Sequence, residues 1–214
     1  MRIGLLGTGN VARALATRWA ATGHDVVLGS RRPQPQPQPH GRADPGLTVT
    51  GLDEAAAHGE VVVNATPGTA SLELLTGIGA PALAGKVLID IAIGFTDDMA
   101  LSHPGVSLGE EIQQAFPATP VVKTLSTMTA SVMADPAGLD SPGNVFLSGD
   151  DTEAKQLTGR LLTDLGWPAS SQLDLGGITT ARGQEHFAML FLGIAGALGT
   201  HTFNIGVITS SAVE

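Results

Sequence analysis

The chain has 214 residues, of which 43% are hydrophobic and 14% charged, with a formal net charge of −9, no cysteine and no tyrosine. This length suffices for one large domain, or for a nucleotide-binding domain with a small partner. Without cysteine there are no disulfides, thiolate nucleophiles or cysteine-ligated zinc sites, and without tyrosine no phenol acts as general acid. The acidic charge argues against nucleic acid as a partner, because phosphate contacts need basic surface.

The charge is unevenly distributed along the chain. Residues 1–42 hold six of the 11 basic side chains and one of the 20 acidic ones, so a small anionic ligand is expected near this end. The opening apolar stretch, residues 3–6, is too short and glycine-rich for a signal peptide. The longest apolar run, residues 187–199, is shorter than the ~18 residues that span a bilayer. We expect a cytoplasmic protein in which this run is a buried helix or a subunit interface.

Apolar, β-branched segments alternate with longer amphipathic stretches from the first residue onward. This pattern predicts an α/β fold with a mostly parallel sheet and helical crossovers. The predicted strands are residues 2–6, 25–28, 61–64, 87–90 and 121–123, with a weaker strand at 48–50. The predicted helices are residues 10–21, 53–58, 72–75 and 109–116.

A glycine motif follows the first predicted strand and opens the first predicted helix. Residues 7–12 read GTGNVA, which has the G-x-G-x-x-A spacing of a dinucleotide fingerprint. Gly7 allows the tight turn, Gly9 lets a pyrophosphate approach the backbone, and helix amides then bind the diphosphate. A lone motif would also fit an ordinary turn. Because strand, turn, helix and second strand follow in order, we predict a Rossmann-type, doubly wound sheet that binds a dinucleotide.

The residues after the second predicted strand discriminate between the two nicotinamide cofactors. Proteins specific for NAD usually place an acidic residue there, about 20 positions on, to bind the ribose hydroxyls. This chain has Gly29-Ser30-Arg31-Arg32 instead. Two guanidinium groups and a hydroxyl match a 2′-phosphate, so NADP(H) is predicted. Solvated surface arginines are the alternative, which leaves the missing acid unexplained.

Proline alternates with glutamine in residues 33–39, directly after these arginines. Alternating proline removes backbone donors and fixes extended geometry, so we expect a polyproline-like or disordered loop. A tolerated surface insertion is favoured over a ligand for another domain.

Two further predicted strands end in turns at the carboxyl edge, where open α/β sheets bind ligands. In the first, Thr66 and Pro67 could shape the pocket over the cofactor. The second is residues 90–94, which include Ala92 and Ile93. A simple strand-ending turn is an equally good interpretation of the first, and the same argument applies to the second.

Acid-base candidates are few. The six histidines show no close metal-ligand spacing, so we predict no metal site. They are His24, His40, His58, His103, His186 and His201. Lys123 and Glu185-His186 could donate protons, but we expect a packed His186 on an apolar helix and a solvated Lys123 at a strand end. Residues 97–98 and 110–111, two pairs of carboxylates, are expected to be solvated loop and helix-start groups.

The sequence changes character after Lys123. A polar segment, residues 124–133, is followed by a predicted strand at 145–148 and by a predicted helix to about residue 165. Asp150 and Asp151 are acids that suit the start of this helix, and Gly166 suits its end. From residue 176 the chain is helix-forming and strongly apolar. We predict a dinucleotide-binding domain at 1–125 and a smaller, helical C-terminal part at 126–214.

The motifs extend well beyond the fingerprint. IGLLGTGNVA and GHDVVLGSRR are shared broadly among Rossmann proteins, whereas VVVNATPG, LAGKVLIDIA, SLGEEIQ, VVKTLSTM, SGDDTEAK and DLGGITTARGQE are more specific. With them the chain resembles, almost end to end, the deazaflavin-dependent NADP oxidoreductases, which pass hydride between NADPH and coenzyme F420. Related nucleotide-binding domains also occur in membrane ferric reductases.

The resemblance implies a Rossmann domain, a small C-terminal part that closes the cleft, and a homodimer. It implies that Thr8, Ser30, Arg31 and Arg32 face the 2′-phosphate, that residues 65–67 lie along the cofactor, and that the deazaflavin stacks near residues 126–128. The predicted cofactor-binding residues are Gly7, Thr8, Gly9, Asn10, Val11, Ser30, Arg31, Arg32, Ala65, Thr66, Pro67 and Ala92. The predicted substrate residues are Ile93, Ser126, Thr127 and Met128.

The leading hypothesis is an NADPH-dependent oxidoreductase that exchanges hydride with a deazaflavin or flavin-like acceptor by aligning two rings, without a catalytic side chain. A reductase of a small imine or carbonyl is the first alternative. The loops near Ile93 and Ser126 differ from the family pattern and permit it, but it needs a proton donor. The scarcity of catalytic side chains motivates the second alternative, a non-catalytic NADPH-binding regulatory protein. The expected partner is a small hydride acceptor or donor, with no nucleic acid and no membrane.

Overall fold

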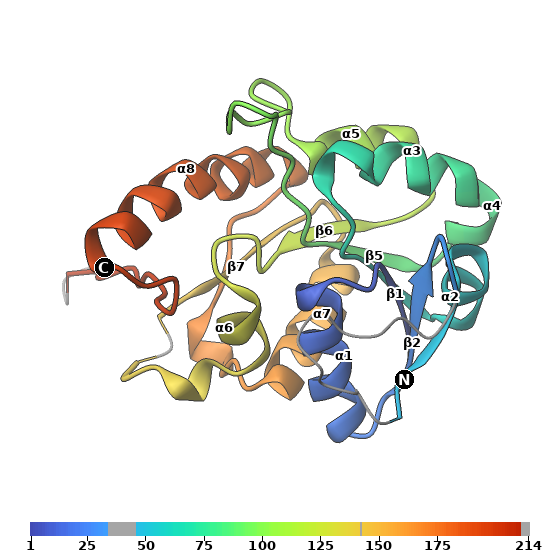
Figure 1. Ribbon diagram of the computed structural model, residues 1–214, viewed down its shortest axis with the longest axis horizontal. Helices are drawn as coiled ribbons and strands as arrows, with labels where there is room; N and C mark the ends of the chain where they lie inside the picture. Colours follow the sequence, from blue (N-terminus) through green and yellow to red (C-terminus); the bar gives the residue numbers. More distant parts are fainter. Residues whose placement is uncertain (34–45, 142, 211–214) are drawn as a thin grey trace.

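The computed structural model describes residues 1–33, 46–141 and 143–210 (Figure 1). The strands of these residues are β1 (Arg2–Leu6), β2 (Asp25–Ser30), β3 (Thr48–Gly51), β4 (Val61–Asn64), β5 (Val87–Asp90), β6 (Val121–Thr124), β7 (Val145–Ser148) and β8 (Gln172–Asp174). The helices are α1 (Asn10–Ala21), α2 (Leu52–His58), α3 (Gly68–Ile78), α4 (Ala80–Leu83), α5 (Leu108–Ala115), α6 (Ala130–Ala134), α7 (Thr152–Leu165) and α8 (Ala181–Leu198). Short 3-10 turns lie at Pro136–Gly138, Ala169–Ser171 and Ile178–Thr180.

The described strands form one eight-stranded sheet in the order β3-β2-β1-β4-β5-β6-β7-β8. Neighbours pair in parallel, except β6 and β7, which are antiparallel. Helices cover both faces of the sheet (Figure 1). The predicted Rossmann-type, doubly wound and mostly parallel sheet is therefore confirmed.

Each face of the sheet carries its own hydrophobic core. On one face, α1, α6 and α7 pack on β1, β4 and β7 around the buried Trp19 and Trp167. Their indole nitrogens donate to the carbonyls of Leu161 and Met133, both at 3.0 Å, so the two tryptophans are held by hydrogen bonds as well as by packing. On the other face, α2 to α5 pack on the opposite sides of the strands.

The sheet continues beyond residue 125. Lys123 at the end of β6 pairs with Ser148 of β7, and β8 then extends the edge. The division into a domain at 1–125 and a part at 126–214 stays a prediction about folding units. As predicted, α7 begins at an aspartate cap, with Asp151 accepting from the Ala154 amide at 2.8 Å, and ends at Gly166 in the left-handed conformation.

Four elements differ from the sequence predictions, and one of them is the short α6, which was not predicted because it begins within the polar segment 124–133. The helix predicted at 72–75 is the middle of the longer α3. The first residues of α3 were not predicted as helix because the sequence Pro67-Gly68 at its start is typical of a turn. The short α4 follows directly and was not predicted. Strand β8 was missed because it has only three residues, of which Leu173 and Asp174 are exposed and give no apolar run.

The apolar run 187–199 lies mostly in α8, and the expectation of a buried helix is wrong. Met189, Leu190, Leu192 and Leu198 are exposed, with Leu190 at 59% and Leu198 at 60%. The reason is that α8 lies at the end of the molecule, beside the sheet rather than beneath other helices (Figure 1). No helix among the described residues combines the length and the apolar character that crossing a membrane requires.

Candidate functional site

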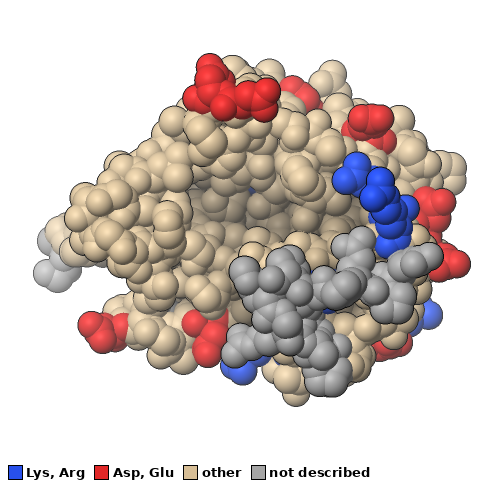
Figure 2. All heavy atoms as spheres, in the orientation of Figure 1, with Lys and Arg blue, Asp and Glu red and all other residues tan. Residues whose placement is uncertain are grey.

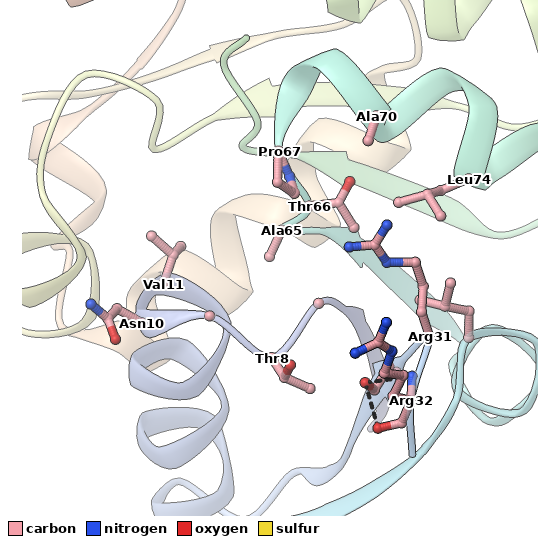
Figure 3. Close-up of a pocket in the computed structure, with 15 residues that line it drawn as sticks. Thr8, Asn10, Val11, Arg31, Arg32, Ala65, Thr66, Pro67, Ala70 and Leu74 are labelled. Carbon is pink, nitrogen blue, oxygen red and sulfur yellow. Dashed lines mark hydrogen bonds between the residues drawn. The ribbon is translucent and has the colours of Figure 1, made fainter. Parts of the chain in front are cut away.

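A cavity of about 730 Å³ opens at the carboxyl ends of β1, β2 and β4 (Figure 3). The strand order reverses at this point, since β2 lies on one side of β1 and β4 on the other, and open α/β sheets bind ligands at such points. The lining residues are Gly7, Thr8, Gly9, Asn10, Val11, Gly29, Ser30, Arg31, Arg32, Leu52, Ala65, Thr66, Pro67, Ala70 and Leu74. All predicted cofactor-binding residues except Ala92 are among them.

The glycine turn leaves the start of α1 open to this cavity. Gly7 has a φ of 121°, its amide donates to the Gly29 carbonyl at 2.9 Å, and an added Cβ would lie 2.6 Å from the Ala65 carbonyl oxygen. Gly9 is the N-cap of α1, and an added Cβ there meets no atom within 4 Å. The backbone amides and the positive dipole end of a 12-residue helix therefore face open space, which suits an anionic diphosphate.

The two arginines stand at one end of the cavity, while Asn10 and Val11 stand at the other (Figure 3). Ser30 fixes the turn that carries the two arginines, because its Oγ accepts from the Arg32 amide at 3.1 Å and donates to the Arg32 carbonyl at 3.0 Å. Both arginines are exposed, and no ion pair within the described parts of the chain involves either guanidinium. They are thus available to a ligand phosphate. Most of the Pro-Gln tract that follows lies outside the described residues.

The turn after β4 is a hydrogen-bonded corner. Asn64 is fully buried, and its Oδ1 accepts from Thr66 Oγ1 at 2.6 Å, while its Nδ2 donates to Asp90 Oδ1 at 2.8 Å. Thr66 Oγ1 also lies 2.9 Å from Ser71 Oγ on α3. The Thr66 hydroxyl is therefore directed into the protein, and the corner holds Ala65 and Pro67 at the cavity wall.

Lys123 is fully buried, so the expectation of a solvated lysine is wrong. Its Nζ lies 2.9 Å from Asp90 Oδ2 and 2.9 Å from Glu185 Oε1. Burial by itself disfavours the charged ammonium, but the attraction of both carboxylates outweighs it and raises the pKa of Lys123. The partners come from β5 and α8, which the local sequence around Lys123 does not reveal. Enclosed in this way, Lys123 links the end of β6 to β5 and α8.

The lysine network holds the loop after β5 in place. Asp90 Oδ1 accepts from the Ala92 amide at 3.2 Å, and Lys123 donates to the Ala92 carbonyl. The Gly68 amide of α3 donates to the Ile93 carbonyl at 3.2 Å. Ala92 is buried under the loop rather than in the cavity lining, whereas Ile93 is partly exposed. Glu185 in turn accepts from the amides at the start of α5, Leu108 at 2.9 Å and Gly109 at 3.1 Å.

The predicted substrate segment after β6 is buried and does not line the cavity. Ser126, Thr127 and Met128 are 6%, 4% and 6% exposed. Met128 belongs to the hydrophobic cluster against which Val11 and Ala65 pack, so the structure brings it near the cofactor-side residues. Leu125, just before them, has a φ of 59°, a conformation rare for a branched side chain. The roles of these residues, like those of the cavity residues, stay predictions.

The histidines are placed differently from the expectation. His186 is exposed rather than packed, with Nε2 3.1 Å from the Pro104 carbonyl oxygen, because it lies on the outer side of α8. His103 had no assigned role in the sequence, yet it contacts both Ser102 and Glu111. Among residues 1–33, 46–141 and 143–210, no group of three or more histidine or carboxylate side chains could hold a metal ion. The absence of a metal site and the cytoplasmic location both stay predictions.

Glu110 fixes α8 to the start of α5. It is a helix-start group as expected, forming a capping box with Ser107, but it is not solvated, because its side chain is only 11% exposed. It also accepts from Arg182 Nε at 2.7 Å and Arg182 Nη2 at 2.6 Å. These hydrogen bonds from Arg182 lower the pKa of the Glu110 carboxyl from 4.5 to about 2. A depressed folded-state pKa stabilises the fold above pH 4.5, and this stabilisation is lost as the pH falls toward 2.

We therefore expect Glu110→Gln to have a lower melting temperature than the native protein at pH 6. The difference between the two melting temperatures should become smaller as the pH falls from 4.5 to 2. Thermal unfolding at several pH values measures this. Glu73→Gln, at an exposed carboxylate of α3, is the control and should run parallel to the native protein. A constant gap for Glu110→Gln across this pH range would show that its carboxylate form does not hold α8.

Comparisons with known proteins agree with this geometry. Residues 2–94 match the model of the family described as "NADP oxidoreductase coenzyme F420-dependent". The crystal structure at 1.70 Å of a candidate F420-dependent NADP-reductase from Arthrobacter sp. FB24 is 41% identical, with a TM-score of 0.87, and the match covers 98% of this chain and 100% of that one.

Two other similarities are more distant. Metalloreductase STEAP3 of Rattus norvegicus is 32% identical over 192 residues, which is 89% of this chain but 37% of the rat protein. The chain thus spans little more than a third of that relative. An imine reductase from Streptomyces aurantiacus is 17% identical with a TM-score of 0.63, covering 92% of this chain and 64% of that one. This last likeness shows a shared fold alone.

Proposed function

We propose that this chain, which belongs to the family of coenzyme F420-dependent NADP oxidoreductases, exchanges hydride between NADP(H) and a ring-shaped acceptor. The acceptor would be the deazaflavin coenzyme F420 or a flavin. One observation supports NADP(H) as the cofactor. The open helix start at Gly9 and the two arginines after β2 border the same cavity, with no carboxylate among the lining residues.

Each part of the cavity fits a part of NADP(H). The amides at the start of α1 would bind the diphosphate, and Ser30, Arg31 and Arg32 would bind the 2′-phosphate. The nicotinamide, which supplies the hydride when NADPH is bound, would lie toward Val11 and Ala65. There the corner at Asn64 and the hydrophobic cluster beneath would fix its distance and face.

The acceptor would bind in the hollow at the centre of this face of the molecule (Figure 2). Acidic side chains lie toward the outline of the molecule and basic side chains lie to the right of the hollow, whereas its visible walls carry few charged groups. A weakly charged hollow beside a dinucleotide cavity suits an aromatic ring system, since ligand sites are mostly apolar with few directed polar groups. Ile93 and the segment Ser126, Thr127 and Met128 stay our proposed acceptor-side residues.

The proposal is tested by mixing the purified protein anaerobically with NADPH and, separately, oxidised F420, FAD, FMN or a cyclic imine. We expect turnover with F420 or a flavin and little with the imine. Dominant turnover of the imine would favour the small-substrate reductase instead. Tight NADPH binding with no turnover above the protein-free rate would favour the regulatory protein.

We also propose a homodimer that forms through the exposed apolar side of α8. Residues 187–199 carry no charged side chain, which suits contact between two copies that each have a net charge of −9. We expect the double variant Leu190→Asp with Leu198→Asp to be monomeric by light scattering. Val106→Asp, at an equally apolar residue that is 45% exposed outside α8, is the control and should remain dimeric. A native protein that is monomeric at all concentrations would contradict the dimer.

A further inference from the structure

The segment between β5 and α5 brings a hydroxyl, an imidazole and a carboxylate into contact. Ser102 Oγ lies 2.8 Å from His103 Nδ1, and His103 Nε2 lies 3.4 Å from Glu111 Oε2 on α5. A carboxylate only accepts hydrogen bonds, so it favours the proton on Nε2 and leaves Nδ1 to accept from Ser102. Catalytic hydroxyls exchange protons through this order of groups.

The hydroxyl end of this chain of groups lies beside the proposed acceptor site. The Ser102 amide donates to the Gly94 carbonyl at 3.0 Å, and an added Cβ at Gly94 would collide with Ser102 Oγ. Gly94 follows Ala92 and Ile93 in the same turn, which Lys123 and Asp90 hold through the backbone of Ala92. The carboxylate end reaches solvent, since the Glu111 side chain is 35% exposed and that of His103 only 16%. The three groups therefore stand in the order carboxylate, imidazole and hydroxyl, with the hydroxyl nearest the proposed acceptor site.

We propose that Ser102, His103 and Glu111 form a proton relay that gives the acceptor the proton accompanying the hydride; this rests on the function proposed above. A deazaflavin, a flavin or an imine that gains a hydride also gains a proton, so the reduction consumes one proton from solution. The candidate donors that the sequence offered, Lys123 and Glu185-His186, do not fit this step. Lys123 is enclosed by two carboxylates and His186 faces outward, whereas Ser102 is partly exposed next to Gly94.

The step balances as follows for reduction of the acceptor. NADPH is oxidised to NADP⁺ and loses a hydride, whose two electrons reduce the acceptor. The Ser102 hydroxyl passes its proton to a basic atom of the acceptor while the His103 imidazolium passes the Nδ1 proton to Ser102 Oγ. Glu111 holds the imidazolium through Nε2. After the reduced acceptor leaves, the Ser102 hydroxyl returns a proton to Nδ1 and takes one from water. The relay itself is neither oxidised nor reduced.

A kinetic experiment tests the relay under saturating NADPH and acceptor at constant pH. General acid catalysis contributes roughly 10²- to 10⁴-fold, so we expect His103→Ala and Ser102→Ala to lower kcat by about 100-fold. The Kd for NADPH should stay within about threefold, because neither residue lines the cofactor cavity. Added imidazole should restore part of the activity of His103→Ala but none of that of Ser102→Ala.

The matched control is His58→Gln. His58 also contacts a carboxylate, with Nε2 3.5 Å from Asp25 Oδ2, but it lies at the end of α2, away from the acceptor site. Its kcat should equal that of the native protein. Native kcat in His103→Ala, or a loss that imidazole leaves unchanged while NADPH still binds, would overturn the relay.

A second measurement decides the relay even where the proposed function fails. If the native protein turns over no acceptor, the function proposed above is wrong, and nitrogen NMR of the ring then reports on the relay alone. We expect neutral His103 to carry its proton on Nε2 in the native protein and to populate both tautomers in Glu111→Gln. A neutral ring with its proton on Nδ1 in the native protein would overturn the relay, because Nε2 would then have no proton to donate to Glu111.

Discussion

Replacing Arg31 and Arg32 together by alanine is expected to weaken NADPH binding by roughly 100-fold or more and NADH binding by less than about threefold. Hydrogen bonds to charged groups contribute about 1.5 kcal/mol or more each, and each 1.4 kcal/mol is a factor of ten in affinity. Both guanidinium groups stand at the cavity end where the 2′-phosphate would lie (Figure 3). NADH lacks that phosphate and therefore loses little.

Titration calorimetry with the two reduced cofactors measures this difference. Arg160→Ala removes an exposed arginine from α7, outside the cavity lining, and controls for the loss of a positive charge elsewhere on the surface. It should leave both affinities within about twofold of the native values. Equal losses of NADPH and NADH affinity in the double variant would show that the arginines do not read the 2′-phosphate.

The second large effect is expected at Lys123. Removing one partner of a buried ion pair leaves uncompensated charge and costs about 3 to 5 kcal/mol. Lys123→Met leaves Asp90 and Glu185 facing each other without the ammonium between them. For a chain of this length, we expect the melting temperature to fall by roughly 6 to 20 °C. Denaturant unfolding gives the same quantity as a free energy.

Two further variants separate the charge effect from lost packing. Lys155→Met removes a lysine whose partner is the surface carboxylate Asp174, 2.8 Å away, and should cost no more than about 1 kcal/mol. Adding Asp90→Asn and Glu185→Gln to Lys123→Met removes the remaining charges and should recover part of the lost stability. A triple variant less stable than Lys123→Met would contradict uncompensated charge as the cause.

The sign of the pKa shift adds a pH dependence. Because the folded-state pKa of Lys123 is raised, its contribution is fully present below the ordinary lysine value of 10.5 and is lost as the pH rises through the folded value. The stability gap between the native protein and Lys123→Met should therefore stay constant from pH 7 to about 9 and shrink only in strong alkali.

The sheet and the cofactor side of the site were predictable because local signals define them. Continuous apolar strands and the GTGNVA turn are each encoded within a few residues, and the arginines after β2 follow at a fixed offset. The structure gathers the predicted cofactor-binding residues, except Ala92, around one cavity. Ala92 falls outside because Asp90 and Lys123 hold the backbone of that loop inward.

The polar groups around the acceptor side could not be predicted in the same way. Lys123 meets Glu185 only because α8 returns to the end of β6, 62 positions along the chain. One local sign was available, a lysine inside the apolar strand VVKT, since a charge in a buried strand needs a partner. His103 meets Glu111 through the turn between β5 and α5, and no periodic pattern encodes that contact.

Direct transfer of hydrogen from the nicotinamide to the acceptor is the central claim, and isotope labelling tests it most directly. The protein is incubated in ordinary water with oxidised F420 and NADPH that carries deuterium at both C4 positions, and the reduced acceptor is analysed by mass spectrometry. We predict one deuterium per reduced acceptor in the native protein. Reduced acceptor that contains only solvent hydrogen, or bound NADPH with no reduced acceptor, would contradict the account.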